Sequence, residues 1–355
     1  MKHKLRFCSL LNMALFLALA PTAMAWTWYV DGVNGNDNND CMTPQTACKT
    51  IGRAISHARR GEIISIAAAT YTENLTINKS LKVIGSGAAT TIVDGNQAGT
   101  VFTISNATAN VLLSELTIRN GNALNVSQEG GGILNSGMLT INKSTITGNS
   151  AKIGGGILNG GALTINNSTI SGNRLAYHGG GIDNYGGTVA ISNSTVSGNR
   201  AVFGGGIFTG GTVAINNSTI SGNSAPSGAG ISYSDNTGTT LQNTIIANPD
   251  GENCSLYGGT VSSNGYNLSS DDTCNFNGPG DMNNTIPLLG KFGYHGGPTQ
   301  TIPLLLGSPA IDAGNPSGCT DSTGKLLKTD QRGYPRPGKY DSGGCDMGAF
   351  EQQKD

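Results

Sequence analysis

Seven side chains between residues 174 and 208 are of the types that bind ligands. They are Arg174, Tyr177, His178, Asp183, Arg200, Phe203 and Phe208. Aromatic side chains beside arginine are typical of contacts with saccharides and with protein surfaces. We therefore expect a carbohydrate or a cell-surface ligand along this stripe. The alternative is a solvated corner, because single exposed aromatic side chains are common and water screens exposed arginines.

Paired carboxylates, which a glycoside hydrolase of the usual kind needs, do not accompany these side chains. Asp183 is the only acidic residue between residues 130 and 227. We therefore expect a protein without catalytic residues, which binds a glycan or another surface along one face. Two alternatives stay open. One is a polysaccharide lyase or glycoside hydrolase with a divergent site, and the other is a purely structural envelope protein.

Asp31, Asp37 and Asp40 lie with several asparagines in the stretch DGVNGNDNND. These oxygen-bearing groups make a weak Ca²⁺ site conceivable, but their spacing does not match an EF-hand loop. A turn in which Asx side chains accept backbone hydrogen bonds is the favoured interpretation. No other metal or cofactor is expected, because the cysteines and histidines lack the close spacing of a zinc site.

The seven side chains belong to a repeat of 24 or 25 residues. Copies begin at Gly130, Gly154, Gly179 and Gly204, with a decayed copy from Gly228, so the clear repeats span 130–253. Short apolar runs of period two predict strands of three to five residues. One such unit cannot bury its apolar edge alone, whereas stacked units form a continuous core. The pattern predicts an all-β fold, a right-handed parallel β-helix.

Stacking predicts which residues meet in neighbouring coils. Apolar side chains of one copy pack on those of the next, namely Leu163, Ile165 and Ile170 on Val189, Ile191 and Val196. An asparagine follows a glycine in every copy, and we expect these residues to form a buried ladder of amides: Asn149, Asn173, Asn199 and Asn223. The glycine triplets fit tight corners between the strands.

The flanking segments suggest the organisation of the whole chain. Residues 1–25 have a basic start, an apolar run and a small-x-small cleavage site, as in a signal peptide. Residues 26–60 form an N-terminal capping segment with an amphipathic helix over 46–59. The β-helix is expected over 61–274, and a separate C-terminal module over 275–355.

Cysteine spacing and charge agree with export. Six cysteines remain after signal cleavage and fall into three local pairs, 41–48, 254–274 and 319–345. Disulfides indicate an oxidising compartment. We expect a secreted or cell-surface monomer without a later transmembrane segment, with the outer membrane or periplasm as alternatives. The net charge of −1 gives no electrostatic basis for binding nucleic acid.

Three stretches resemble known bacterial families. WYVDGVNGNDNNDC, ACKTIGRAI and GEIISIAAATYTENLTI together resemble the start of pectate-lyase-like β-helix proteins. The GGGI and STISGN units resemble passenger repeats of polymorphic outer-membrane proteins. The tail, with HGGPTQTIPLLLGSPAIDAGNP and CDMGAFE, is similar to the choice-of-anchor Q module, which implies attachment to a cell envelope. The first resemblance implies a carbohydrate-active fold, but the clustered aspartates of polygalacturonases are not matched here.

Overall fold

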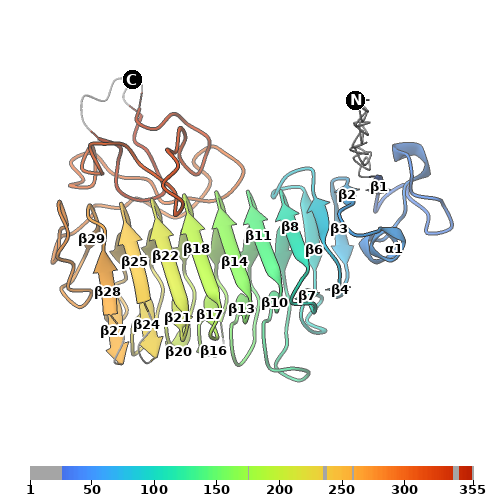
Figure 1. The fold of residues 1–355 in the computed structure, drawn as a ribbon, viewed down its shortest axis with the longest axis horizontal. Helices are drawn as coiled ribbons and strands as arrows, with labels where there is room; N and C mark the ends of the chain where they lie inside the picture. The colour runs from blue at the N-terminus through green and yellow to red at the C-terminus, as the bar shows by residue number, and fades with distance from the viewer. Residues whose placement is uncertain (1–25, 175, 235–237, 258–259, 339–343, 354–355) are drawn as a thin grey trace, which may run out of the picture.

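The structure is a computed structural model, and it describes residues 26–174, 176–234, 238–257, 260–338 and 344–353. The predicted signal peptide, residues 1–25, lies outside the described residues. The chain is a parallel β-helix in which each coil contributes one strand to each of three long parallel sheets. Figure 1 shows the coils stacked side by side, with the N-terminal cap at one end and the C-terminal segment along one side.

The three long sheets, named A, B and C, are each built from strands of successive coils. Sheet A contains β1 (Thr27–Val30), β2 (Ile63–Ile66), β5 (Leu81–Ile84), β8 (Asn110–Ser114), β11 (Met138–Asn142), β14 (Ala162–Asn166), β18 (Thr188–Ser192), β22 (Thr212–Asn216), β25 (Gly238–Gln242) and β28 (Thr260–Ser263). Sheet B contains β3 (Ala69–Thr72), β6 (Thr91–Asp94), β9 (Thr117–Arg119), β12 (Thr145–Thr147), β15 (Thr169–Ser171), β19 (Thr195–Ser197), β23 (Thr219–Ser221), β26 (Ile245–Ala247) and β29 (Leu268–Ser269). Sheet C contains β4 (Leu75–Ile77), β7 (Phe102–Ile104), β10 (Ile133–Asn135), β13 (Ile157–Asn159), β17 (Ile182–Asn184), β21 (Ile207–Thr209), β24 (Ile231–Ser234) and β27 (Cys254–Tyr257).

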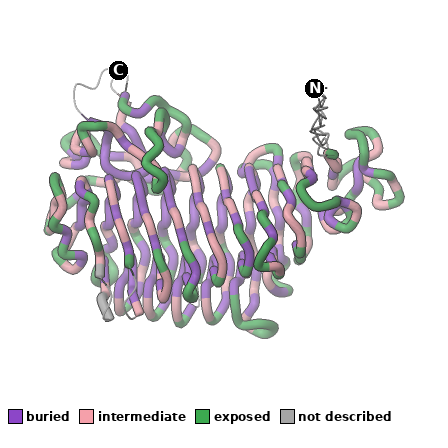
Figure 2. The backbone as a smooth tube through the Cα atoms, viewed as in Figure 1, coloured by how far each residue is buried: buried purple, intermediate pink, exposed green. Residues whose placement is uncertain are grey.

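The predicted register between coils is confirmed. Leu163 pairs with Val189 and Ile165 with Ile191 across β14 and β18, while Ile170 pairs with Val196 across β15 and β19. All six side chains are buried in one continuous apolar core. Figure 2 shows the buried positions recurring from coil to coil along its length. Burial of this aligned apolar surface is the main term that stabilises the stack.

The predicted asparagine ladder is also confirmed, and it continues beyond the regular repeats. The Asn173 side chain donates to Asn199 Oδ1 at 3.0 Å, and the ladder runs on through Asn223 to Asn248 and Asn253. A second ladder joins Asn135, Asn159, Asn184 and Thr209 at the end of sheet C. Both ladders satisfy buried polar groups at the corners of the helix.

The N-terminal cap differs from the prediction at its start. The helix α1 covers only Ile51–His57, rather than 46–59, and a short 3-10 helix, η1 (Pro44–Thr46), precedes it. The intervening chain is extended because Cys48 forms a parallel bridge with Val30. Thr50 then caps α1, its hydroxyl accepting a hydrogen bond from the Arg53 N–H at 3.2 Å.

All three predicted disulfides are present. They join Cys41 to Cys48 beside the cap, Cys254 to Cys274 at the last coils, and Cys319 to Cys345 in the C-terminal segment. Each closes a local loop, which restricts the unfolded chain. No helix among the described residues is long and apolar enough to cross a membrane.

The C-terminal segment packs on a column of polar residues along sheet B. After β29 the described residues form turns and isolated bridges but no strand or helix. The column, here named the Asn–Thr column, consists of Asn167, Thr169, Asn193, Thr195, Asn217, Thr219 and Asn243. Its asparagines from Asn167 to Asn243 have positive φ angles. Except at Asn167, which accepts through its backbone oxygen, its side chains bond to residues of the C-terminal segment. The Asn-x-Ser/Thr pattern of the repeats therefore builds a docking surface within the chain.

Candidate functional site

The candidate site lies where the turns from sheet B to sheet C differ between coils. In two successive coils these turns form short strands, β16 (Ala176–His178) and β20 (Ala201–Phe203), which pair in parallel outside the three long sheets. Gly179 and Gly204, each with a positive φ angle, follow the two strands and lead the chain back into sheet C. The pair β16 and β20 is named the groove wall below, because several of its residues line a groove.

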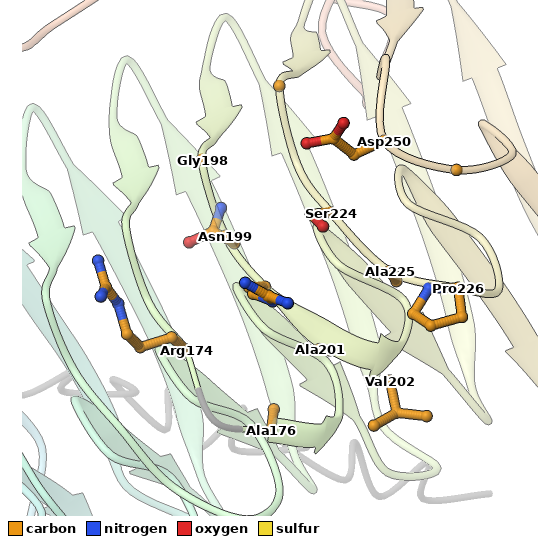
Figure 3. A pocket seen from close by; sticks show the side chains of 13 residues that line it. Arg174, Ala176, Gly198, Asn199, Ala201, Val202, Ser224, Ala225, Pro226 and Asp250 are labelled. Carbon is orange, nitrogen blue, oxygen red and sulfur yellow. The ribbon is translucent and has the colours of Figure 1, made fainter.

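The groove is open and has a volume of about 1070 Å³. Its lining residues come from consecutive coils and are Arg174, Ala176, Gly198, Asn199, Arg200, Ala201, Val202, Gly222, Ser224, Ala225, Pro226, Asp250 and Gly251. In Figure 3, Arg174 and Asp250 lie toward opposite ends of the groove. Stacked backbone bridges between Arg200, Ser224 and Asp250 fix the order of these side chains.

The two arginines of the groove are exposed and one coil apart. Neither guanidinium forms an ion pair or a side-chain hydrogen bond with the described residues. Successive coils of a parallel sheet are about 4.8 Å apart. The groove therefore presents two adjacent planar cations, each able to bind a carboxylate through two parallel hydrogen bonds.

Four predicted aromatic residues gather in and beside the groove wall. The ring of His178 stacks on Phe208 with centroids 4.2 Å apart and an interplanar angle of 7°. Tyr177 meets Phe203 edge to face at 5.4 Å, and half of the tyrosine, 51%, is exposed. This cluster attaches the groove wall to the outer face of sheet C and leaves Tyr177 at the rim.

Asp183 is the one buried residue among the seven predicted for the site. It points outward from β17, but the turns cover it, so only 1% of its surface is exposed. Neither carboxylate oxygen has a hydrogen-bond partner among the described residues. Burial, and secondarily the charge of Glu129, raises the pKa of the Asp183 carboxyl to about 7. Asp183 therefore cannot contact a ligand in this conformation, which corrects its assignment to the binding stripe.

The aspartates of the conceivable Ca²⁺ site form hydrogen bonds within the protein. The Asp37 carboxylate accepts hydrogen bonds from Lys49 N–H, Thr50 N–H and the Thr50 hydroxyl, all at 2.9 Å. Asp31 accepts from two backbone N–H groups within its own turn, and these bonds lower its pKa. Within the described part of the chain, no three His, Cys, Asp or Glu side chains are placed to hold a metal ion.

Two parts of the groove were not predicted from the sequence. Ser224 and Asp250 complete one end, although neither stands out in the aligned copies. The position of Ser224 in the repeat could have indicated it, because Ser224 follows the ladder residue Asn223 as Arg200 follows Asn199. Asp250 belongs to the decayed copy, where alignment by sequence alone fails.

Comparisons with known proteins agree on the fold. No protein-family model and no curated protein matches the sequence. Among solved structures, pectate lyase Pel9A is 17% identical, with 92% of this chain and 96% of that chain covered and a TM-score of 0.46. A pectin methylesterase from carrot is 11% identical, covers 74% of this chain and 84% of its own, and has a TM-score of 0.41. The similarity concerns the parallel β-helix alone.

Proposed function

We propose that this protein is an exported β-helix protein that binds an acidic glycan in the groove and does not cleave it. The observation that carries this proposal is the pair Arg174 and Arg200, exposed one coil apart in the groove and without an ion pair to any described carboxylate, Asp250 at the far end of the groove included. Their repeat of about 4.8 Å is close to the length of one sugar unit. Carboxylates on neighbouring sugars of a chain lying across the coils would meet successive guanidinium groups.

The rest of the groove supports a saccharide rather than a fatty or fully apolar ligand. Ser224 offers a hydroxyl group, and Val202 and Pro226 offer small apolar surfaces. Tyr177 at the rim provides an aromatic face of the kind on which sugar rings pack. Three disulfides fit a protein that works in an oxidising compartment, outside the cytoplasm.

Removing both arginines is expected to abolish most of this affinity. In the variant Arg174→Ala/Arg200→Ala, affinity for a hexamer of galacturonic acid should fall about 100-fold, because two charge-assisted contacts are lost. Isothermal titration calorimetry measures this change. The matched control is Arg53→Ala/Arg60→Ala, which removes two exposed arginines near the cap and should bind as wild type does. Equal affinity of wild type and the groove variant would exclude the groove as the site.

The alternatives are tested with the same protein. A lyase or hydrolase would shorten polygalacturonate, which gel filtration of the incubated polymer detects. A purely structural envelope protein would bind neither acidic nor neutral oligosaccharides. The burial of Asp183 favours binding over cleavage at this site, because a general acid must reach the glycosidic oxygen.

A further inference from the structure

The groove wall borders both the groove and sheet C. Ala176, Ala201 and Val202 form part of the lining of the groove. From the same two strands, His178 and Phe203 join the aromatic cluster against the outer face of sheet C. Any change that loosens the wall from sheet C therefore also changes the shape of the groove.

Asp183 stands in sheet C at the place where the wall is attached. Its partners in register are Leu158 of β13 and Phe208 of β21, and Phe208 carries the stacked His178 ring. In the preceding coil Leu158 occupies the same position, and its side chain has no polar atom that needs a hydrogen bond. The aspartate places two unpartnered oxygens in a covered apolar setting, where an ionised carboxylate is strongly disfavoured.

The charged and titratable groups around Asp183 are few. Glu129, in the turn before β10, carries a negative charge that contributes to raising the pKa of Asp183. His178 of β16 is the titratable group stacked on its neighbour Phe208. Lys152, in the turn between these two coils, is exposed to solvent. Leu158 and Phe208, on the flanking strands, carry no charge.

The connections of the wall allow it to move without breaking the core. The wall is linked to the preceding and following turns by bridges of His178 with Ile153 and of Phe203 with Ser227, and by backbone hydrogen bonds such as those from Tyr177 N–H and Ala201 N–H. Its own strands are followed by Gly179 and Gly204 in the left-handed conformation. The interior side of sheet C holds a separate set of residues, Ile182 and Asn184, on the opposite face of β17 from Asp183.

We propose that Asp183 is a pH-dependent latch, which holds the groove wall on sheet C while its carboxyl group is neutral and releases the wall when the group ionises. As regulation of glycan binding, this inference rests on the proposed function. As a movement of the wall, it does not depend on any ligand.

The direction of the pH effect follows from burial. Because the pKa of Asp183 is raised from 3.8 to about 7 with the wall closed, the stability that Asp183 contributes to the closed state is greatest below pH 4. This stability is lost progressively as the pH rises to about 7 and changes no further above it. Burial lowers the pKa of His178, so protonation of this ring opposes closure on the acid side of 6.5. A comparison in which His178 is unchanged isolates the aspartate.

Hydrogen exchange measured between pH 5 and pH 8.5 tests the latch in the ligand-free protein. The amides of Tyr177 and Ala201, which donate to Lys152 O and Ser224 O, report on the wall. Asp183→Leu copies the residue of the preceding coil, and Asp183→Asn is a second uncharged variant. We expect the protection factor of each variant, divided by that of wild type, to rise about tenfold per pH unit up to pH 7 and then to level off.

The amides of β18 in the core are the internal reference and should keep a constant ratio. A ratio at the wall that does not change with pH, or an equal change in β18, would overturn the latch. Calorimetry with the galacturonic acid hexamer at pH 5.5 and pH 8 adds the link to binding. If exchange responds to pH but nothing binds, the proposed function fails and the latch stands. If the hexamer binds but exchange ignores Asp183, the latch fails and the proposed function stands.

Discussion

Replacement of Asn173 with alanine is expected to lower the free energy of unfolding by about 4 kcal/mol. The Asn173 side chain is fully buried. Its amide donates to Ile146 O at 3.1 Å and to Asn199 Oδ1 at 3.0 Å. Its oxygen accepts from the backbone N–H of Asn149 at 3.0 Å. Alanine leaves the Ile146 carbonyl and the Asn149 N–H buried without these partners, and each such group costs about 1–3 kcal/mol.

Chemical denaturation followed by circular dichroism measures this loss. The matched control is Asn166→Ala, which changes the same residue type in the same coil on the outer side of β14. It should alter stability by about 0.5 kcal/mol or less, because no buried group loses a partner. A loss in Asn173→Ala no larger than in the control would show that the ladder adds little beyond the apolar core.

Replacement of Arg336 with methionine is expected to lower stability by about 4 kcal/mol and to release the C-terminal segment. The side chains of Arg336 and Glu351 are completely buried and meet at 2.9 Å. The guanidinium also donates to Asn193 Oδ1 at 3.1 Å and to Gly348 O at 2.9 Å. Methionine preserves much of the volume but leaves the Glu351 carboxylate buried without its cation, which is the costly part of breaking such a pair.

Limited proteolysis detects this release as faster cleavage between residues 299 and 337, while the β-helix stays resistant. The control is Arg119→Met, which removes an arginine–aspartate pair of similar length, 2.8 Å, whose arginine side chain is 39% exposed. Exposed pairs contribute about 0–1 kcal/mol, so the control should be cut at the wild-type rate. Equal cutting of both variants would mean that other contacts hold the segment.

The repeats made the core predictable because stacking converts sequence spacing into spatial contact. Once the copies are aligned, Leu163 must meet Val189, and Asn173 must meet Asn199, as the structure shows. The second ladder follows the same logic, since Asn135, Asn159 and Asn184 recur two residues after the isoleucine of the first three GGGI motifs. The sequence prediction covered only the first ladder, formed by the asparagine that follows a glycine in each copy.

The candidate site was less predictable because it lies in turns that do not follow the repeat. Aligned copies place Arg174 and Arg200 one coil apart, and both line the groove. They do not show on which side of a turn each residue emerges. Ala176 and His178 emerge on the same side of β16, yet Ala176 lines the groove while the ring of His178 stacks on Phe208 of sheet C. The turns that fold over the outer face of β17 bury Asp183. The spacing of residues in the sequence does not indicate this burial.

Repeat proteins commonly gain or lose whole coils when tandem DNA copies recombine. In a simple stack, adding or removing one unit costs little, because each coil contacts only its neighbours. The Asn–Thr column changes this, since the C-terminal segment bonds to Thr169, Asn193, Asn217 and Asn243 in four successive coils. An added or deleted coil between these residues would displace every later contact by one step. The C-terminal segment therefore fixes the number of coils in this stretch. The number of coils nearer the N-terminus is not constrained by these contacts.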